Sequence, residues 1–306
     1  METRNMRFLE RDCVELSNGQ MTLRVTRSDG LRIIYLASPG GRNIMAEVPD
    51  IEIPPPVGGK PVFKLIGGHR LWYGPEVEGR TYRADYLDSL EITPLADGVR
   101  AIQETDPAGM RKTMDIQLAS DKPQVTVTQS LENHGQWPVE TYPWGLTVVR
   151  PGGFAILPQT TEAADLYALT PNRALVLWTY THIRDPRLVL GDRYILIHAN
   201  PEISNSLKVG CANRRGWFAY FIDRTLLVKA VEYQEGMEYS DMGCSAEIYT
   251  NNRFLELEAL APLTILEPGE TTTITETWTV FGDVDIEATE DSVAKAVETL
   301  CLDDLG

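Results

Sequence analysis

The segment Gly67–Glu76 brings together four chemically versatile side chains, those of His69, Arg70, Trp72 and Glu76. It opens with two glycines, which tolerate positive φ and let the backbone turn sharply or approach a ligand closely. The imidazole, guanidinium and carboxylate can form directional hydrogen bonds with a hydroxylated ligand, and the indole can supply an apolar face. This combination suits a sugar. The alternative is structural, because Gly-Gly turns, Arg–Glu pairs and buried tryptophans also occur where no ligand binds.

A second candidate site lies in the stretch Leu255–Ala259, where apolar and acidic residues alternate. In a strand, this period of two places Glu256 and Glu258 on one face and the apolar residues on the other. Two carboxylates at this spacing lie roughly 7 Å apart, close enough for one to raise the pKa of the other toward the range of a general base. Alternating glutamates on a solvent-exposed face are the structural alternative, although acidic residues are depleted in strands.

Three residues outside these segments are candidates for binding a ligand. Trp144 follows a predicted strand in an aromatic-rich stretch, Lys208 precedes the aromatic segment Trp217–Tyr220, and Asp241 lies in a polar turn. Each residue taken alone is explained by ordinary core or loop structure.

The overall charge argues against two classes of partner. The 306 residues carry 44 acidic and 28 basic side chains, a formal net charge of −16. Such a field repels nucleic-acid backbones and anionic membrane surfaces, whereas a neutral small-molecule carbohydrate is indifferent to it. Solubility is an equally simple reason for the charge. The sequence leaves the oligomeric state open.

The chain lacks the sequence patterns of several cofactor- and metal-dependent enzymes. It has no GxSxG, Walker or HExxH motif and no dinucleotide fingerprint within a βαβ unit, and its four cysteines and four histidines are scattered. We therefore expect no cofactor and no bound metal. The first residues form no apolar signal core, no run of about 18 apolar residues occurs, and no CxxC pair is present, so a reduced cytoplasmic protein is expected.

The hydrophobic pattern predicts an all-β fold, a large antiparallel sandwich. Short alternating runs separated by turns, as expected for its strands, occur at 21–26, 31–36, 124–131 and 271–281. One amphipathic helix is predicted at about 290–302, with Thr289 as its N-cap. The Pro- and Gly-rich stretch 54–59 is interpreted as a loop that shapes a site, and the whole chain, 1–306, as one domain.

In these segments and their order, the chain resembles the galactose-mutarotase-like superfamily. It is most similar to an uncharacterised bacterial branch with a Gly-Gly-His-Arg-Leu-Trp…Pro-Glu signature, here residues 67–76, and the similarity runs from the first strand to about Phe281. The expected order continues through the stretches 208–210, 217–220, 239–243 and 256–258. The resemblance implies a supersandwich, a large two-layer antiparallel β fold with a sugar site on a concave sheet.

The resemblance also implies catalytic roles. In aldose 1-epimerases a strand glutamate removes the proton from the C1 hydroxyl and a histidine protonates the ring oxygen, so that the sugar opens and recloses as the other anomer. Glu258 is similar to the glutamate of their Leu-Glu-x-Gln-x-x-Pro pattern, although Leu260 replaces the glutamine and one residue fewer precedes the proline. Glu258 is thus the expected base, with Glu256 second.

One departure from the family pattern concerns the acid. Aldose 1-epimerases carry their acid histidine in a His-x-Tyr-Phe-Asn segment, and this chain has Trp144 near that place. His69, on another loop, is the expected replacement. Arg70 is expected to bind vicinal hydroxyls, which suit its planar guanidinium. The full set of expected substrate-binding residues is Arg70, Trp72, Glu76, Trp144, Lys208 and Asp241.

The predicted function is that of a carbohydrate-active protein, most simply an aldose 1-epimerase-like isomerase that needs only a positioned acid and base. Two alternatives stay open. One is a sugar-binding or regulatory module that kept the fold without the chemistry, which the missing His-x-Tyr-Phe-Asn segment favours. The other is a different carbohydrate enzyme, a glycoside hydrolase or lyase, that uses Glu76, Glu256 and Glu258.

Overall fold

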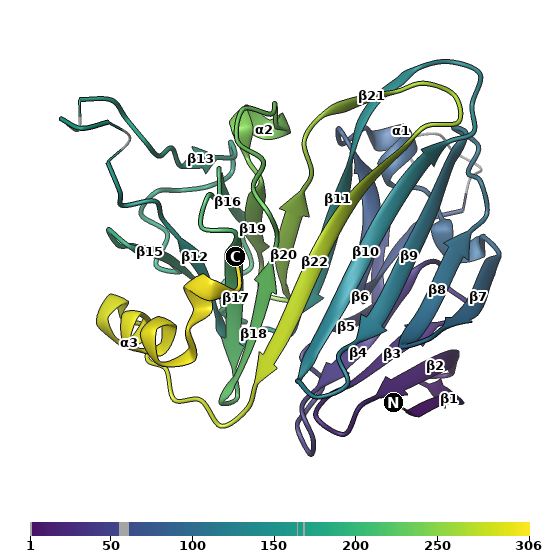
Figure 1. Ribbon diagram of the computed structural model, residues 1–306, viewed down its shortest axis with the longest axis horizontal. Coiled ribbons are helices and arrows are strands. Elements are labelled where there is room, and N and C mark those ends of the chain that lie inside the picture. The colour runs from purple at the N-terminus through teal and green to yellow at the C-terminus, as the bar shows by residue number, and fades with distance from the viewer. Residues whose placement is uncertain (1, 55–60, 164, 168) are drawn as a thin grey trace.

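The computed structural model describes residues 2–54, 61–163, 165–167 and 169–306, and two large sheets account for most of them (Figure 1). The twelve strands of the first sheet are β1 (Glu2–Phe8), β2 (Arg11–Ser17), β3 (Thr22–Thr26), β4 (Arg32–Ala37), β5 (Glu47–Ile53), β6 (Phe63–Gly74), β11 (Val139–Val149), β13 (Val176–Leu177), β16 (Leu207–Cys211), β19 (Ala246–Thr250), β20 (Leu255–Leu260) and β21 (Thr264–Leu266). Their order is β1-β2-β3-β4-β6-β11-β20-β19-β16-β13, with β5 paired to β6 and β21 to β11.

The second sheet has ten strands in the order β14-β15-β12-β17-β18-β22-β10-β9-β8-β7. They are β7 (Leu90–Leu95), β8 (Gly98–Gln103), β9 (Met110–Leu118), β10 (Gln124–Asn133), β12 (Phe154–Pro158), β14 (Leu188–Leu190), β15 (Tyr194–His198), β17 (Trp217–Ile222), β18 (Thr225–Ala230) and β22 (Thr271–Phe281). The remaining elements are short: α1 (Glu78–Thr81), α2 (Ser240–Gly243), α3 (Glu290–Leu300) and two 3₁₀ turns, η1 (Asp85–Leu87) and η2 (Leu302–Asp304).

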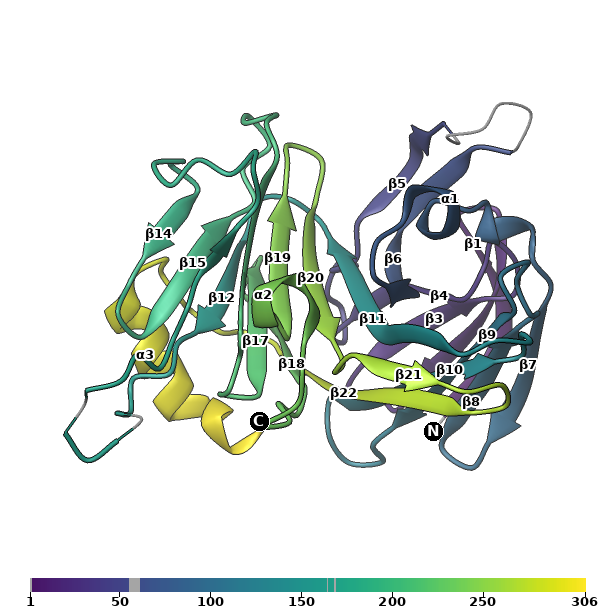
Figure 2. The ribbon, with the colours of Figure 1, turned by 90° about the horizontal axis from the view of Figure 1, so that it is seen from above.

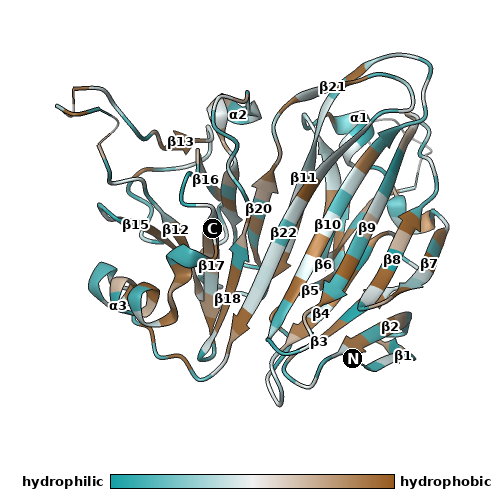
Figure 3. Cartoon of the chain, viewed as in Figure 1, coloured by the Kyte–Doolittle hydropathy of each residue, from teal (hydrophilic) through white to brown (hydrophobic). Residues whose placement is uncertain are grey.

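Alternating side chains explain how the two sheets pack. Along β9 and β10 every second residue is buried, and Figure 3 shows the matching alternation of hydrophilic and hydrophobic segments. Strand β11 of the first sheet packs against β10 and β22 of the second. The apolar residues of β20, among them Leu255 and Leu257, are buried in the main core. The antiparallel all-β fold predicted from the sequence is confirmed.

Helix α3 covers a second, smaller core on the other face of the second sheet. Its N-cap is Thr289, whose hydroxyl accepts a hydrogen bond from the backbone N–H of Ser292, as the sequence predicts. Val293 and Val297 pack with side chains of β12, β15, β17 and β18. The predicted helix at about 290–302 ends at Leu300, because the next residue adopts a left-handed conformation that stops the helix.

The two glycines of the sequence motif bend a strand rather than open a loop. Both lie inside β6, with φ of +104° at Gly67 and +71° at Gly68. A Cβ atom on Gly67 would stand 2.0 Å from the carbonyl oxygen of Ala46, and one on Gly68 would stand 2.3 Å from that of Ile33. Only glycine fits both the left-handed backbone and this close approach of neighbouring strands.

Because of this bend, the two parts of β6 pair with different strands. Up to Gly67 it pairs with β5, and from Gly68 onward it pairs with β11 in the large sheet. We call β5 and the first part of β6, residues 47–53 and 63–66, the β5–β6 arm. Figure 2 shows the arm extending away from the rest of the sheet.

Two predictions from the sequence, the loop at 54–59 and the single domain, stay predictions. The loop predicted at 54–59 lies almost wholly on residues 55–60, outside the described part of the chain. The interpretation of 1–306 as one domain stays a prediction. Within the described residues, no helix is both long and apolar enough to cross a membrane.

Candidate functional site

A cavity of about 430 Å³ lies on the face of the first sheet that points away from the second sheet. Its floor is formed by side chains of β6, β11 and β20, and the arm forms one of its walls. Residues of both sequence motifs therefore reach one site. The lining that chemistry could use comprises Arg70, Trp72, Glu76, Tyr82, Trp144, Trp178, Tyr180, Ser206, Lys208, Tyr249, Asn251, Glu256 and Glu258.

Strand register brings the charged residues together. In one row across the sheet, Arg70 of β6 pairs through Leu146 of β11 with Glu258 of β20 and then with Glu247 of β19. In the next row, Glu256 pairs with Tyr249, which in turn pairs with Lys208 of β16. Within β19, and likewise within β20, the two named positions are two residues apart, and directly paired residues on neighbouring strands point to the same side. All these side chains therefore share one face of the sheet.

Lys208 sits between two buried carboxylates. Its Nζ atom lies 2.7 Å from Oε2 of Glu247 and 2.9 Å from Oε2 of Glu258. The same Glu258 oxygen accepts a hydrogen bond of 2.9 Å from the indole N–H of Trp144. Its other oxygen, Oε1, has no hydrogen-bond partner within the described residues. One carboxylate oxygen is thus held by two donors while the other is free to accept a proton.

The pKa values of this cluster reflect burial and the sharing of one ammonium group. Burial raises the pKa of Glu258, and nearby Glu256 adds to the rise, while Lys208 opposes it. Burial also raises the pKa of Glu247 well above its usual value. For Lys208, burial alone would lower the pKa, but the two glutamates outweigh it and raise the pKa well above its usual value. Lys208 therefore stays protonated, and Glu258 has the raised pKa of a general base.

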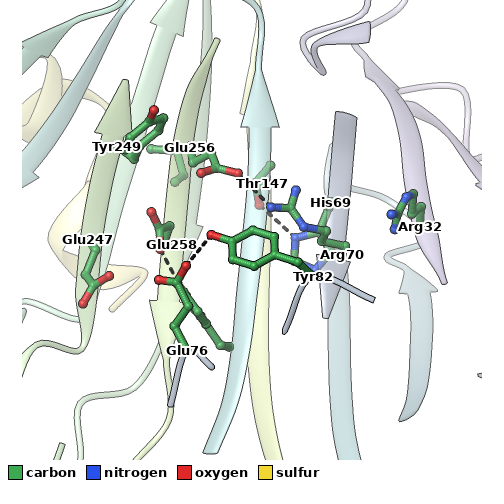
Figure 4. Close-up of polar contacts among 12 residues, drawn as sticks. Arg32, His69, Arg70, Glu76, Tyr82, Thr147, Glu247, Tyr249, Glu256 and Glu258 are labelled. Atoms are coloured by element: carbon green, nitrogen blue, oxygen red, sulfur yellow. Dashed lines mark hydrogen bonds and ion pairs between the residues drawn. The ribbon is translucent and has the colours of Figure 1, made fainter. Parts of the chain in front are cut away.

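Arg70 and Glu256 form a second buried pair beside this cluster. Nη2 of Arg70 donates to Oε1 of Glu256 at 2.9 Å, and Figure 4 shows these two side chains on the same face of the sheet. The Arg70 guanidinium lies 4.3 Å from the ring centroid of Trp72. The Nε and Nη1 atoms of Arg70 have no partner within the described residues, although the side chain is almost fully buried. Buried donors are normally satisfied, so these two are available to ligand oxygens.

Aromatic rings surround the charged groups. The Trp72 and Trp144 rings stand edge to face, with centroids 5.4 Å apart. Nζ of Lys208 lies 5.1 Å from the Trp144 ring centroid and 4.7 Å from that of Trp178. At the exposed edge of the cavity, the hydroxyl of Tyr82 donates to the carboxylate of Glu76 (Figure 4). Flat apolar faces beside polar groups suit a sugar, which has both hydroxyls and C–H faces.

The structure corrects the prediction that His69 is the catalytic acid. His69 and Arg70 are consecutive in β6, so their side chains point to opposite faces of the sheet. Arg70 lines the cavity, whereas His69 is fully buried between the two sheets. It does not reach the cavity that Glu258 lines.

His69 belongs instead to a buried polar network between the sheets. Its Nδ1 lies 2.9 Å from the hydroxyl of Thr147 and its Nε2 lies 3.0 Å from Oε1 of Gln129. Nε2 of Gln129 donates to Glu276, and Lys229 forms an ion pair of 2.9 Å with the same glutamate. Because the amide oxygen of Gln129 can only accept, Nε2 of His69 carries the proton. Burial lowers the pKa of His69 to about 4.

The Asp241 prediction is also corrected. This residue lies in α2, is exposed to solvent, and is absent from the cavity lining. The turn after Tyr239 carries its backbone into a left-handed conformation outside the sheet, with φ of +50°. By contrast, Arg70, Trp72, Glu76, Trp144, Lys208, Glu256 and Glu258 all line the cavity.

Several residues that line the cavity are not predicted from the sequence. Tyr82, Trp178 and Tyr180 come from segments without a strand pattern, and no sequence signal connects them to the site. Glu247, which lies beside the cavity lining, and Tyr249 are not among them: because they alternate as Glu256 and Glu258 do, the sequence predicts that they extend the same polar face from the preceding strand, here β19. Their alignment with the β20 glutamates depends on the pairing register, which the alternation alone does not fix.

Comparison with known proteins identifies the fold. No family model and no curated protein sequence matches the chain. Among solved structures, it is similar to a galactose mutarotase-like protein from Lactobacillus casei, with a TM-score of 0.53, 9% identity, and coverage of 88% of this chain and 100% of the other. The chain is also similar to a proposed aldose 1-epimerase from Escherichia coli K12, with a TM-score of 0.53 and 14% identity. This similarity covers 88% of this chain and 98% of the other.

A third similar structure comes from a longer protein. A TPR-domain containing protein from Parabacteroides distasonis gives a TM-score of 0.59 with 12% identity. The similarity covers 92% of this chain but 50% of that protein, so the chain spans half its length. At these identities the comparisons show the fold alone: the chain has the galactose mutarotase-like fold that the sequence resemblance implies.

Proposed function

We propose that this protein binds an uncharged sugar in the cavity of the first sheet and interconverts its anomers. The observation that carries the proposal is the environment of Glu258, a buried carboxylate with a raised pKa and one unpartnered oxygen. That oxygen removes the proton from the C1 hydroxyl as the bond between C1 and the ring oxygen breaks, which leaves an aldehyde at C1 and the electron pair on the former ring oxygen. Rotation about the C1–C2 bond then presents the other face of the aldehyde. The former ring oxygen re-forms its bond to C1 on that face, and Glu258 returns the proton to the new C1 hydroxyl.

The ring oxygen needs a positive or hydrogen-bonding partner as the ring opens. Among the described lining residues there is no imidazole, and Lys208 is the cation beside Glu258. In our proposal the Lys208 ammonium supplies this charge, and Arg70 binds neighbouring hydroxyls through Nε and Nη1. Trp72 and Trp144 form the apolar face against which the sugar ring lies.

The charge of the lining supports an uncharged substrate. Three glutamates, Glu76, Glu256 and Glu258, line the cavity against two cations, Arg70 and Lys208. Both cations are already paired with carboxylates. A sugar phosphate would therefore meet a net negative lining in which the charge of each cation is already balanced by a carboxylate, and its binding would be unfavourable.

A second candidate function is supported by one observation. Because His69 faces the opposite side of the sheet, the described lining lacks the imidazole acid of aldose 1-epimerases. A protein that binds a sugar without transforming it would have no need of that acid.

Saturation-transfer NMR on reducing sugars separates the two functions. Anomer exchange faster than in buffer supports the isomerase. Line broadening of a sugar without faster exchange supports a binding module. Activity on a non-reducing glycoside, which has no free anomeric hydroxyl, would instead indicate a glycoside hydrolase or lyase that uses the same glutamates.

A further inference from the structure

The cavity has an apolar wall that the proposed sugar chemistry does not use. Four of its residues come from the β5–β6 arm, and Phe254, at the start of the β20 side of the neighbouring hairpin, adds a fifth. We define the apolar wall as Ile51, Ile53, Phe63, Leu65 and Phe254. The groups that would hold a sugar ring, such as Arg70 and Glu258, lie on the large sheet.

The arm is amphipathic, and its apolar face points into the cavity. Ile53 pairs across the arm with Phe63, so these two residues share a face. On the opposite face Glu52 pairs with Lys64, and their side chains form an ion pair of 3.5 Å. An arm that only extended the sheet into solvent would need no such division. Here the apolar side lines the cavity and the charged side faces away from it.

An ion pair connects the arm to the β19–β20 hairpin, which leads into Phe254 of the apolar wall. Nη2 of Arg253, at the tip of the β19–β20 hairpin, lies 2.8 Å from Oδ2 of Asp50 in β5. Phe254 follows Arg253 directly, and its ring lies 5.7 Å from that of Tyr249. The pair therefore ties the arm to the segment that carries Phe254, which joins the two parts of the apolar wall.

The apolar wall is continuous with the aromatic groups of the sugar site. The ring centroid of Phe63 lies 5.7 Å from that of Trp72 and 5.6 Å from that of Tyr82. Ile51 and Ile53 are only half-buried, so part of their apolar surface is open in the absence of a ligand. A ligand that covers this surface gains binding energy from the area removed from water.

We infer that the cavity takes a sugar carrying an apolar group, which the apolar wall binds. This inference rests on the proposed sugar function and adds the substrate class. The polar half of the cavity binds the ring through Glu258, Lys208 and Arg70, and the apolar half binds the substituent. A plain monosaccharide fills only the polar half.

Four pairs of probes, in two sets, test the inference by NMR titration. One set attaches the group at C1 and compares the methyl with the 4-nitrophenyl glycoside, for glucose and for galactose. The other set attaches it at C6 and compares each of the two free hexoses with its 6-O-benzyl ether. We expect the aromatic member of at least one pair to bind about tenfold or more tightly than its partner.

Variants on the two faces of the arm locate the effect. We expect the double variant Ile51→Ser, Ile53→Ser to reduce the advantage to about twofold or less, with the affinity of the smaller partner unchanged. The control Glu52→Gln lies on the outer face and keeps the full advantage. Equal affinities within all four pairs, or an advantage that survives in the double variant, would overturn the apolar subsite while leaving sugar binding intact. Binding of no probe at all would overturn the sugar function together with the subsite.

Discussion

Lys208 and Glu258 form a buried ion pair in which Nζ lies 2.9 Å from Oε2, the same oxygen that accepts the indole N–H of Trp144. Both donors therefore occupy one side of the carboxylate. The remaining oxygen, Oε1, is the one left for a substrate hydroxyl. A buried carboxylate with a purely structural role normally accepts hydrogen bonds at both oxygens.

The substitution Glu258→Gln keeps the size and hydrogen-bonding shape of the side chain but removes the base. We expect the rate of anomer exchange to fall by about 10²–10⁴-fold, the usual contribution of general acid–base catalysis. Circular dichroism should show an unchanged β fold. The matched control is Glu140→Gln, an exposed glutamate of β11 outside the cavity lining. Full activity in the Glu258 variant would rule out its role as the base.

The pH dependence tests the sharing of Lys208 between two carboxylates. Because Glu258 must be ionised to act as a base, activity should rise with pH through its raised pKa. Glu247 competes for the ammonium of Lys208. In Glu247→Gln the ammonium serves Glu258 alone, so the pKa of Glu258 should fall and the acid limb of the pH profile should move to lower pH. A shift to higher pH, or none, would contradict this account of the cluster.

His69 and Arg70 show which part of the site the sequence predicts and which part it does not. The motif that contains them predicts a site, and Arg70 lines the cavity, but the sequence predicts a loop for His69 where the structure has the strand β6. In a strand, adjacent residues cannot share a face, which separates the two side chains by the thickness of the sheet. The alternation at Glu256 and Glu258 was interpreted as a strand, and both glutamates line the cavity.

Other features depended on long-range pairing. The meeting of Lys208 with Glu247 and Glu258 requires the register of three strands, β16, β19 and β20. The alternation within each strand fixes its two faces, but the partner and the register depend on turns and on packing across the sheet. The strands and the C-terminal helix could therefore be predicted from local pattern, whereas the ion-pair cluster could not.

The buried network around His69 predicts a pH-dependent contribution to folding stability. The folded-state pKa of His69 is about 4, below its ordinary value of 6.5. Between these values the unfolded chain binds the proton and the folded chain does not, so this contribution is present above about pH 6.5 and is lost as the pH falls toward 4. The full difference is on the order of 3 kcal/mol.

Urea unfolding of wild type and His69→Gln measures this contribution. The difference in the free energy of unfolding between the two proteins should decrease as the pH falls from 7 to 4, because glutamine does not titrate. Using the difference removes the effects of Glu247, Glu258 and Glu276, which titrate in both proteins. A difference independent of pH would mean that His69 is not held neutral.

The bend in β6 predicts an unusual sensitivity to a single methyl group. Gly67→Ala would place Cβ 2.0 Å from the carbonyl oxygen of Ala46 at a φ of +104°. We expect the free energy of unfolding to fall by more than about 2 kcal/mol and sugar affinity to drop, because the arm must move. Gly19→Ala is the matched control: its φ is +80°, but nothing lies within 4 Å of the added atom. It should cost about 1 kcal/mol and leave binding unchanged.

The most direct test of the proposed function is saturation-transfer NMR of anomer exchange across neutral, acidic and phosphorylated reducing sugars, with wild type and Glu258→Gln side by side. We predict exchange faster than in buffer for at least one neutral sugar, and the loss of this acceleration in the variant. The 6-phosphate of that sugar should show a smaller acceleration over its own rate in buffer. Exchange at the buffer rate for every sugar, or equal acceleration by both proteins, would contradict it.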